Sequence, residues 1–377
     1  MQDKRKFIFY YLNTGAGHIS AAKVLSRAML AENSNIEIKM LNGFAPHRFA
    51  HLVFERGYNF SLNYMRGLFP LTYDLGQSWF VQNIFLRILE KEITKNLREQ
   101  IYIEHPTDII SFHFALTPFL RKIVKNLPWK VNLTCIVTDP FTAPTCWFYD
   151  RFAQYMVYSE EAKKVAVERC KVPEKNVTVV PFLMNEKFRT PISQEEARNL
   201  KIKYGFDPNK KIVLLVGGGE GLPGATEIIN QCIKKKNKFS VVVICGRDKA
   251  KRHAFNILAK TYPRLDLHVY GFVDFLDELV KLCDCAVIKA GPATMMEVLA
   301  SKKPVIICRY IHNQELGNMR FAVNHKVGWF IQKPKDIYNK ITELLSDTEF
   351  DQKMQKRFES IQLDTDASKI AKILLQK

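Results

Sequence analysis

The chain has 377 residues, of which 47% are hydrophobic and 25% are charged, as is typical of a globular protein. This length predicts two domains rather than one. The net charge of +18 favours an anionic partner: nucleic acid, an acidic membrane surface or a phosphorylated substrate. No basic arm or zinc-finger spacing accompanies this charge, so no nucleic-acid partner is expected. No apolar run is long enough to predict a signal peptide or a transmembrane helix.

The first predicted elements are a strand, a glycine turn and a helix. An apolar run at residues 7–12 leads into Gly15 and Gly17, followed by His18, and the helix is expected to begin near Ser20. Two glycines allow the backbone to approach a ligand. The turn is not a dinucleotide-binding fingerprint, because Ser20 stands where that motif has its third glycine.

The segment from residue 44 to residue 89 is rich in aromatic residues and arginines. It contains Trp79 and Phe80, and four arginines, among them Arg66 and Arg87, against two carboxylates. Aromatic and basic residues together are typical of a surface at the lipid headgroup boundary. The same aromatic residues could instead form the core of the first domain, and the sequence leaves both interpretations open.

Short apolar runs alternate with helix-like segments along the rest of the chain, which predicts parallel strands. Strands are predicted at residues 7–12, 36–41, 108–112, 131–137, 155–158, 177–180, 212–216, 240–244, 267–270, 285–288 and 305–308. A polar stretch with two prolines follows residue 180 and predicts a linker. We therefore expect an α/β protein with two Rossmann-like doubly wound domains, residues 1–185 and 186–354, facing an interdomain cleft. A closing helix at about 355–377 is expected to pack on the first domain.

Eight cysteines lie mostly in these apolar runs, without the paired spacing of a metal site. They predict reduced thiols in a cytoplasmic protein, and no metal-binding residues are predicted. They are Cys135, Cys146, Cys170, Cys232, Cys245, Cys283, Cys285 and Cys308.

Three polar motifs follow strands of the second domain. Residues 217–219 are three glycines, which can cradle a phosphate or form a plain tight turn. After residue 288 a glycine turn leads into a helix, with Thr294 as the expected cap and Glu297 one turn inside. A carboxylate there can accept both hydroxyls of a ribose, or simply complement the helix dipole. The polar residues 313–318 after the next strand favour a nucleotide-sugar site.

Taken together, these motifs resemble the monogalactosyldiacylglycerol synthase family. The resemblance covers nearly the whole chain, and its most specific part runs from Lys289 to Asn318. It implies a GT-B fold and an inverting transfer of a hexose from a UDP-sugar to diacylglycerol, with no obligatory cofactor or metal. The UDP-sugar would bind the C-terminal domain and the lipid acceptor the N-terminal domain.

The resemblance also assigns individual residues. The donor-binding residues would be Gly218, Gly219, Gly291, Pro292, Ala293 and Thr294 near the diphosphate, Gly246, Phe272 and Val273 around the uracil, Glu297 at the ribose, and Gln314 and Glu315 at the sugar. Gly15, Gly17 and Trp147 would contact the acceptor. The chain departs from the plant-type pattern at Ala143, where that pattern has a histidine, and in its additional Cys146.

Inversion at the anomeric carbon requires one base that takes the proton of the acceptor hydroxyl. His18 suits this role because an unperturbed imidazole titrates near neutral pH. Asp139, in a Thr-Asp pair similar to the family's signature, is the alternative base or the group that orients His18. The sequence leaves the choice between them open.

We therefore expect a glycosyltransferase that binds the cytoplasmic face of an anionic membrane as a peripheral protein. One alternative is N-acetylglucosamine transfer to a polyprenyl-diphosphate acceptor, as in the related lipid II enzymes. Another is a noncatalytic basic protein that binds membranes or nucleic acid. The donor sugar, the number of sugars added and the oligomeric state are not determined by the sequence.

Overall fold

The computed structural model describes residues 4–13, 16–45, 79–361 and 363–376, with only the backbone at residue 16 and residues 79–86. The chain divides into two compact units. Unit 1 comprises residues 1–183, 312–314 and 364–377, and unit 2 comprises residues 184–311 and 315–363. The division after Leu183 lies close to the linker predicted after residue 180.

Unit 1 contains a six-stranded sheet in the order β2-β1-β3-β4-β5-β6, in which every pairing is parallel. Its strands are β1 (Arg5–Tyr11), β2 (Ile36–Asn42), β3 (Asp108–Ser111), β4 (Asn132–Ile136), β5 (Gln154–Val157) and β6 (Val177–Val179). The chain passes from β1 to β2 on one side and then continues with β3 on the other. The strand order thus reverses between β1 and β3, and ligands of doubly wound sheets bind beyond the carboxyl ends of such strands.

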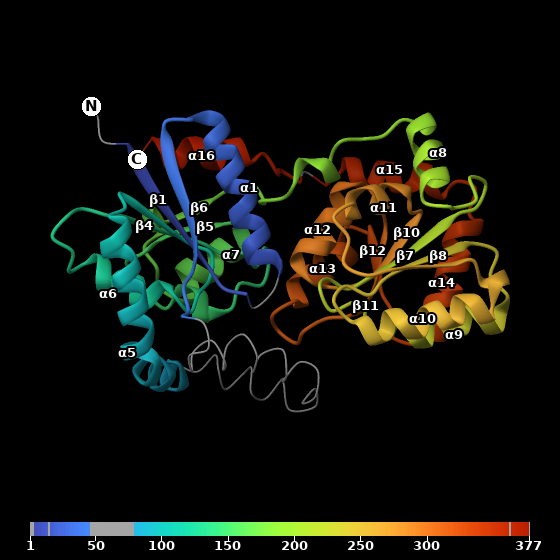
Figure 1. Ribbon diagram of the computed structural model, residues 1–377, viewed down its shortest axis with the longest axis horizontal. Helices are drawn as coiled ribbons and strands as arrows, with labels where there is room; N and C mark the ends of the chain where they lie inside the picture. Colours follow the sequence, from blue (N-terminus) through green and yellow to red (C-terminus); the bar gives the residue numbers. More distant parts are fainter. Residues whose placement is uncertain (1–3, 14–15, 46–78, 362, 377) are drawn as a thin grey trace. The chain divides into compact units, whose positions relative to one another are not determined.

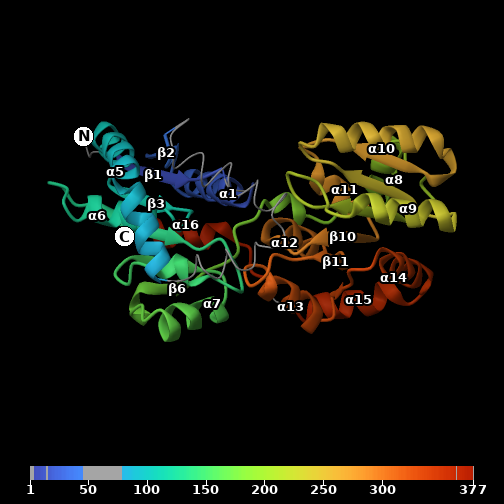
Figure 2. The same ribbon diagram turned by 90° about the horizontal axis from the view of Figure 1, so that it is seen from below.

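Helices cover both faces of this sheet, and alternate side chains of β1 pack into the two cores. Phe7 and Phe9 belong to the apolar core that includes residues of α1 (Ala16–Glu32) and α16 (Ala367–Leu375). Ile8 and Tyr10 belong to the core on the other face, together with α5 (Trp79–Glu104) and α6 (Thr117–Val124). Figures 1 and 2 show α16, the last helix in the sequence, lying against α1.

A guanidinium fixes the end of α16 to this unit. Arg5 donates to the carbonyl oxygens of Leu374 (3.0 Å) and Leu375 (2.8 Å), and its Nε lies 2.8 Å from Asp108 Oδ2. Residues from the two ends of the chain therefore complete one core.

Unit 2 contains a second parallel six-stranded sheet, in the order β12-β11-β10-β7-β8-β9. Its strands are β7 (Ile212–Val216), β8 (Ser240–Ile244), β9 (Leu267–Tyr270), β10 (Cys285–Lys289), β11 (Val305–Arg309) and β12 (Gly328–Phe330). Here the order reverses between β7 and β10, so ligand binding is expected where these two strands end.

Helices cover the faces of the second sheet, with α8 packing on α11 and α9 on α14. Unit 2 contains α8 (Gln194–Lys203), α9 (Ala225–Lys235), α10 (Lys249–Thr261), α11 (Leu276–Leu282), α12 (Pro292–Ala300), α13 (Leu316–Asn324), α14 (Pro334–Ser346) and α15 (Phe350–Glu359), and a shorter helix of unit 1 is α7 (Glu160–Lys164).

The two doubly wound sheets confirm the predicted fold class, and all eleven predicted strands form. Three details differ. The first helix begins at Ala16 rather than near Ser20, so that Gly17 and His18 lie in its first turn. The prediction of a single closing helix is wrong, because α15 ends at Glu359 and a second helix, α16, starts after Asp366. The Asp366 side chain caps α16 by accepting from Ser368 N–H. The three-residue edge strand β12 was not predicted.

Candidate active site

In unit 1, several polar side chains gather where β1, β3 and β4 end. His18 lies in the first turn of α1, which follows β1, and His113 follows β3. Thr138 and Asp139 follow β4. Since β1 and β3 are the neighbours at which the strand order reverses, these residues lie where a doubly wound sheet binds ligands.

The hydrogen bonds of His18 determine which ring nitrogen carries the proton. Its Nδ1 lies 2.8 Å from the carbonyl oxygen of Phe112, which can only accept, so Nδ1 is the donor. The Thr138 hydroxyl lies 3.0 Å from the same nitrogen. Burial lowers the pKa of His18 to about 4, against the opposing effect of the Phe112 carbonyl. His18 is therefore neutral at pH 7, with a lone pair on Nε2 that can accept a proton.

His113 is a second histidine of this cluster, and the sequence analysis did not identify it. The two imidazole centroids are 4.8 Å apart, and His113 is 3% exposed. Its Nδ1 accepts a hydrogen bond from Ala115 N–H (3.2 Å), so its proton is on Nε2. Burial and the neighbouring His18 hold its pKa well below the ordinary value. Its position directly after a predicted strand was the available signal.

Trp147 lies near both histidines and is hydrogen-bonded to Asp139. The indole Nε1–H donates to Asp139 Oδ2 over 2.7 Å, and the Trp147 ring lies 6.2 Å from that of His18. Trp147 belongs to a short helix, Thr145–Phe148, and is 1% exposed. It therefore supports the cluster from within the core.

In unit 2, glycines let two loops pack backbone against backbone beyond β7 and β8. Gly218 and Gly246 have positive φ values of 80° and 60°. Arg247 N–H donates to the carbonyl of Gly219 over 2.8 Å. A Cβ added at Gly246 would lie 2.2 Å from that same carbonyl oxygen. The loops can meet in this way only if residue 246 is glycine.

We expect Gly246→Ala to destabilise unit 2 and to displace the two loops. The methyl group would force the two loops apart in addition to the strain of the positive φ, at a combined cost of at least about 2 kcal/mol. Gly205→Ala is the matched control, since Gly205 has φ of 73° and nothing lies within 4 Å of an added Cβ. It should cost about 1 kcal/mol and leave the two loops in place. Equal effects of the two variants in chemical unfolding would contradict the steric argument.

The helix α12 begins shortly after the end of β10. Its first residue is Pro292 and its N-cap is Gly291, so Thr294 is the third helical residue and not the predicted cap. Proline favours the first helical position because its φ is fixed and it has no N–H to leave unpaired. The first helical bond runs from Met295 N–H to the Gly291 carbonyl (3.1 Å). The N–H groups of Ala293 and Thr294 therefore have no partner within the helix.

Glu297 lies one turn into α12 and is half-buried. Burial, together with the negative charge of Asp277, raises the pKa of its carboxyl group to about 7. Within the described residues, no hydrogen-bond donor reaches this carboxylate. A ligand that supplies hydroxyl donors would satisfy it.

The loop after β9 presents Phe272, which is 67% exposed. The guanidinium of Arg247 lies 6.0 Å from the centre of its ring, and Val273 beside it is half-buried. An exposed aromatic ring near the glycine loops offers a surface on which a base can stack.

Glu315 and Asn318 are the buried residues around the start of α13. Glu315 is 3% exposed, accepts from Ile311 N–H (2.8 Å) and lies 3.2 Å from Lys289 Nζ. Gln314 is half-buried and donates its backbone N–H to the His312 carbonyl (2.7 Å).

Asn318 carries an unsatisfied polar atom at this loop. It is 1% exposed, and its Nδ2 donates to the carbonyl of Ala290 over 2.9 Å. Its Oδ1 is buried with no partner in the described structure. The loop that precedes α12 therefore lies beside an acceptor that a ligand could satisfy.

Several predicted residues cannot be placed. Gly15, Arg66 and the side chains of Trp79 and Phe80 lie outside the described residues. Arg87 is exposed on α5, next to Ile88, which is 64% exposed. Among the helices that the structure describes, none has the length and hydrophobicity that crossing a bilayer requires.

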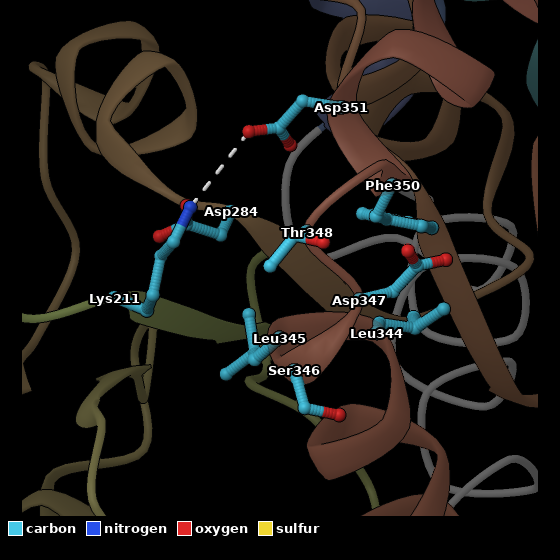
Figure 3. A pocket seen from close by; sticks show the side chains of 9 residues that line it. All are labelled: Lys211, Asp284, Leu344, Leu345, Ser346, Asp347, Thr348, Phe350 and Asp351. Carbon is cyan, nitrogen blue, oxygen red and sulfur yellow. Dashed lines mark ion pairs between the residues drawn. The ribbon is translucent and has the colours of Figure 1, made fainter.

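A pocket of about 160 Å³ lies at the amino ends of the strands of the second sheet, where β7 and β10 begin. Figure 3 shows Lys211 and Asp284 on one side of it and the chain from Leu344 to Asp351 on the other. Lys211 Nζ lies 2.9 Å from Asp284 and 3.8 Å from Asp351. Because it adjoins the amino ends of the strands, this pocket is separate from the glycine loops.

Two family models match the chain. Residues 18–180 match the model described as monogalactosyldiacylglycerol (MGDG) synthase, and residues 212–372 match the glycosyltransferase family 28 C-terminal domain. These matches confirm the resemblance inferred from the sequence.

The chain is similar to curated proteins of the same kind. It is 27% identical over 353 residues to a probable monogalactosyldiacylglycerol synthase of Nicotiana tabacum, covering 90% of this chain and 64% of that protein. It is 24% identical to a processive diacylglycerol beta-glucosyltransferase of Bacillus pumilus, covering 100% and 96%. The chain thus spans less than two thirds of the plant relative.

Solved structures share the fold. The UDP-GlcNAc 2-epimerase of Neisseria meningitidis has a TM-score of 0.62 at 17% identity, covering 99% of this chain and 100% of that one. HepE of Anabaena, solved in complex with UDP-glucose, has a TM-score of 0.60 at 12% identity, covering 98% and 99%. At these identities the likeness concerns the architecture alone.

Proposed function

Because the chain belongs to the monogalactosyldiacylglycerol synthase family, with a glycosyltransferase family 28 C-terminal domain, we propose that it transfers a hexose from a UDP-sugar to diacylglycerol. The product is a membrane glycolipid. The tobacco and Bacillus relatives are named for such reactions, and HepE was solved with UDP-glucose.

Unit 2 binds the UDP-sugar in this proposal. The glycine loops after β7 and β8 admit the diphosphate close to the backbone, and the unpaired N–H groups of Ala293 and Thr294 donate to its oxygens. Glu297 accepts the ribose hydroxyls, which supply the donors that its carboxylate lacks. Phe272 and Val273 border the uracil.

Unit 1 binds the acceptor and supplies the base. The Nε2 lone pair of His18 takes the proton from the diacylglycerol hydroxyl as its oxygen bonds to the anomeric carbon. The bond from that carbon to the β-phosphate oxygen breaks on the opposite face, and its electron pair leaves with UDP, so the configuration inverts. The single observation that carries the proposal is the neutral His18, whose Nδ1–H is held by the Phe112 carbonyl.

Asp139 supports this cluster through Trp147 in our proposal, because its observed bond goes to the indole. Trp147 packs near both histidines and so helps to position them beside the acceptor. We also propose that the protein acts at the surface of an anionic membrane, where exposed Arg87 and Ile88 and the net charge of +18 favour binding.

The test uses the purified protein with UDP-glucose, UDP-galactose or UDP-N-acetylglucosamine and vesicles that contain diacylglycerol and anionic lipid. We expect UDP release and a glycosylated diacylglycerol with one of the hexose donors. Vesicles without diacylglycerol are the control. A polyprenyl-diphosphate-linked muramoyl-peptide in place of diacylglycerol tests the alternative acceptor. No lipid product from any of the three donors with diacylglycerol would refute the proposal.

A further inference from the structure

Lys289 occupies a position for which the proposed function has so far given no role. It is the last residue of β10, one of the two strands between which the order of the second sheet reverses. The pairing of β10 with β11 is irregular between Ile288 and Lys289. Ile288 lies opposite Ile307 and Lys289 opposite Arg309, so the extra residue, Cys308, is on β11.

The Lys289 side chain lies between the glycine loop after β7 and the start of α12. A Cβ added at Gly218 would lie 4.0 Å from Lys289 Cε, and one added at Gly291 would lie 3.0 Å from Nζ. The side chain is 32% exposed, so a ligand can reach it. Its ammonium group therefore stands beside both structures that are suited to bind a diphosphate.

Glu315 holds this ammonium group in place. One carboxylate oxygen lies 3.2 Å from Lys289 Nζ, and the other accepts from Ile311 N–H over 2.8 Å. Glu315 is 3% exposed, so its position is fixed by its surroundings. An ammonium group has three N–H donors, and one contact with Glu315 leaves donors for a ligand.

We propose that Lys289 binds the β-phosphate of the donor and stabilises the charge of the departing UDP, and that Glu315 is a positioning residue for Lys289 rather than a contact of the sugar. This inference rests on the proposed use of a UDP-sugar. When the bond between the anomeric carbon and the β-phosphate oxygen breaks, its electron pair adds negative charge to that oxygen. A fixed ammonium group beside it lowers the energy of the transition state.

Calorimetry with UDP and with uridine tests this assignment, because only UDP carries the diphosphate. Lys289→Met should weaken UDP binding about 10- to 100-fold, the usual effect of losing a charge-assisted hydrogen bond, and leave uridine binding unchanged. Lys289→Arg should restore UDP affinity to within a few-fold. Glu315→Gln should leave the ratio of UDP-hexose to UDP affinity unchanged.

Two further variants guard against a general loss of structure. Lys289→Met leaves Glu315 buried without its partner, so Lys289→Met/Glu315→Gln removes both charges and should show the same loss of UDP affinity. Lys211→Met is the matched control. Lys211 pairs with Asp284 (Figure 3), where the strands of the same sheet begin, whereas Lys289 lies where they end. The Lys211→Met variant should bind UDP as the wild type does.

Each contrary result has a distinct meaning. If the wild type binds UDP and the double variant binds it within threefold as tightly, Lys289 does not bind the diphosphate. If Glu315→Gln weakens UDP-hexose binding but not UDP binding, Glu315 contacts the sugar and the positioning role is wrong. If the wild type binds neither UDP nor any UDP-sugar, the proposed function itself fails.

Discussion

Replacing His18 by alanine should lower kcat for glycolipid formation by about 10²- to 10⁴-fold, the usual contribution of a general base. The variant removes the only ring in this cluster whose Nε2 is proposed to take the acceptor proton. UDP affinity should stay within threefold of the wild type, because the residues proposed to bind UDP all belong to unit 2. Single-turnover kinetics and calorimetry measure the two quantities separately.

His325→Ala is the matched control for this variant. His325 is exposed in unit 2, and its Nδ1 lies 2.9 Å from the Phe321 carbonyl, the same kind of contact that His18 makes with Phe112. It should leave kcat unchanged. A kcat for His18→Ala within threefold of the wild type would transfer the role of base to another group, with Asp139 as the first candidate.

Glu297→Gln should weaken UDP binding at pH 8 by about 10- to 100-fold and also stabilise unit 2. The amide cannot accept both ribose hydroxyls as a carboxylate can, and bonds to a charged acceptor are the stronger ones. Folding raises the pKa of Glu297 from 4.5 to about 7. The folded state therefore binds more protons between these values, so the free energy of unfolding falls as the pH rises from about 4.5 to 7.

The neutral amide avoids this penalty, so the variant should gain ~3 kcal/mol at pH 8 and almost nothing at pH 4. Chemical unfolding at both pH values measures the gain. The exposed Glu343→Gln on α14 is the control and should change neither stability nor UDP binding. A destabilised Glu297→Gln at pH 8 would show that the carboxylate has a partner and is not poised for a ligand.

The pH dependences of kcat and of KM should distinguish His18 from Glu297 in the wild type. With a pKa of about 4, His18 stays deprotonated from pH 8 down to pH 5, so kcat should be constant in that range. Glu297 becomes protonated as the pH falls through about 7, so KM for the UDP-sugar should rise there. In Glu297→Gln the rise in KM near pH 7 should be absent.

Most of the fold could be predicted from the sequence because buried parallel strands appear as short apolar runs. The strand β12 escaped detection because Gly328–Phe330 is too short to form such a run. Thr294 was predicted as a cap from its side chain, but Pro292 two residues earlier decides where the helix begins. At α12 a neighbouring proline thus outweighs the local preference of Thr294 for the cap position.

The site was harder to predict because it depends on which strands become neighbours. Residues 18 and 113 are far apart in the sequence, and the pairing of β1 with β3 brings their rings to 4.8 Å. Likewise, the pairing of β10 with β11 brings Lys289 toward Glu315. Apolar periodicity carries no information about this order, so His113 and the ion pair became visible only in the structure.

The position of α16 in unit 1 has a consequence for synthesis on the ribosome. Its Ile370 and Leu374 complete a core that also contains Phe7 and Leu25. At typical rates, translating the residues between 183 and 367 takes roughly 10–40 s. During that time unit 2 can fold as it emerges, while the face of the first sheet that α16 covers stays open and available to a chaperone. Most of unit 1 is thus synthesised before unit 2, but its core is completed only after unit 2 has been synthesised.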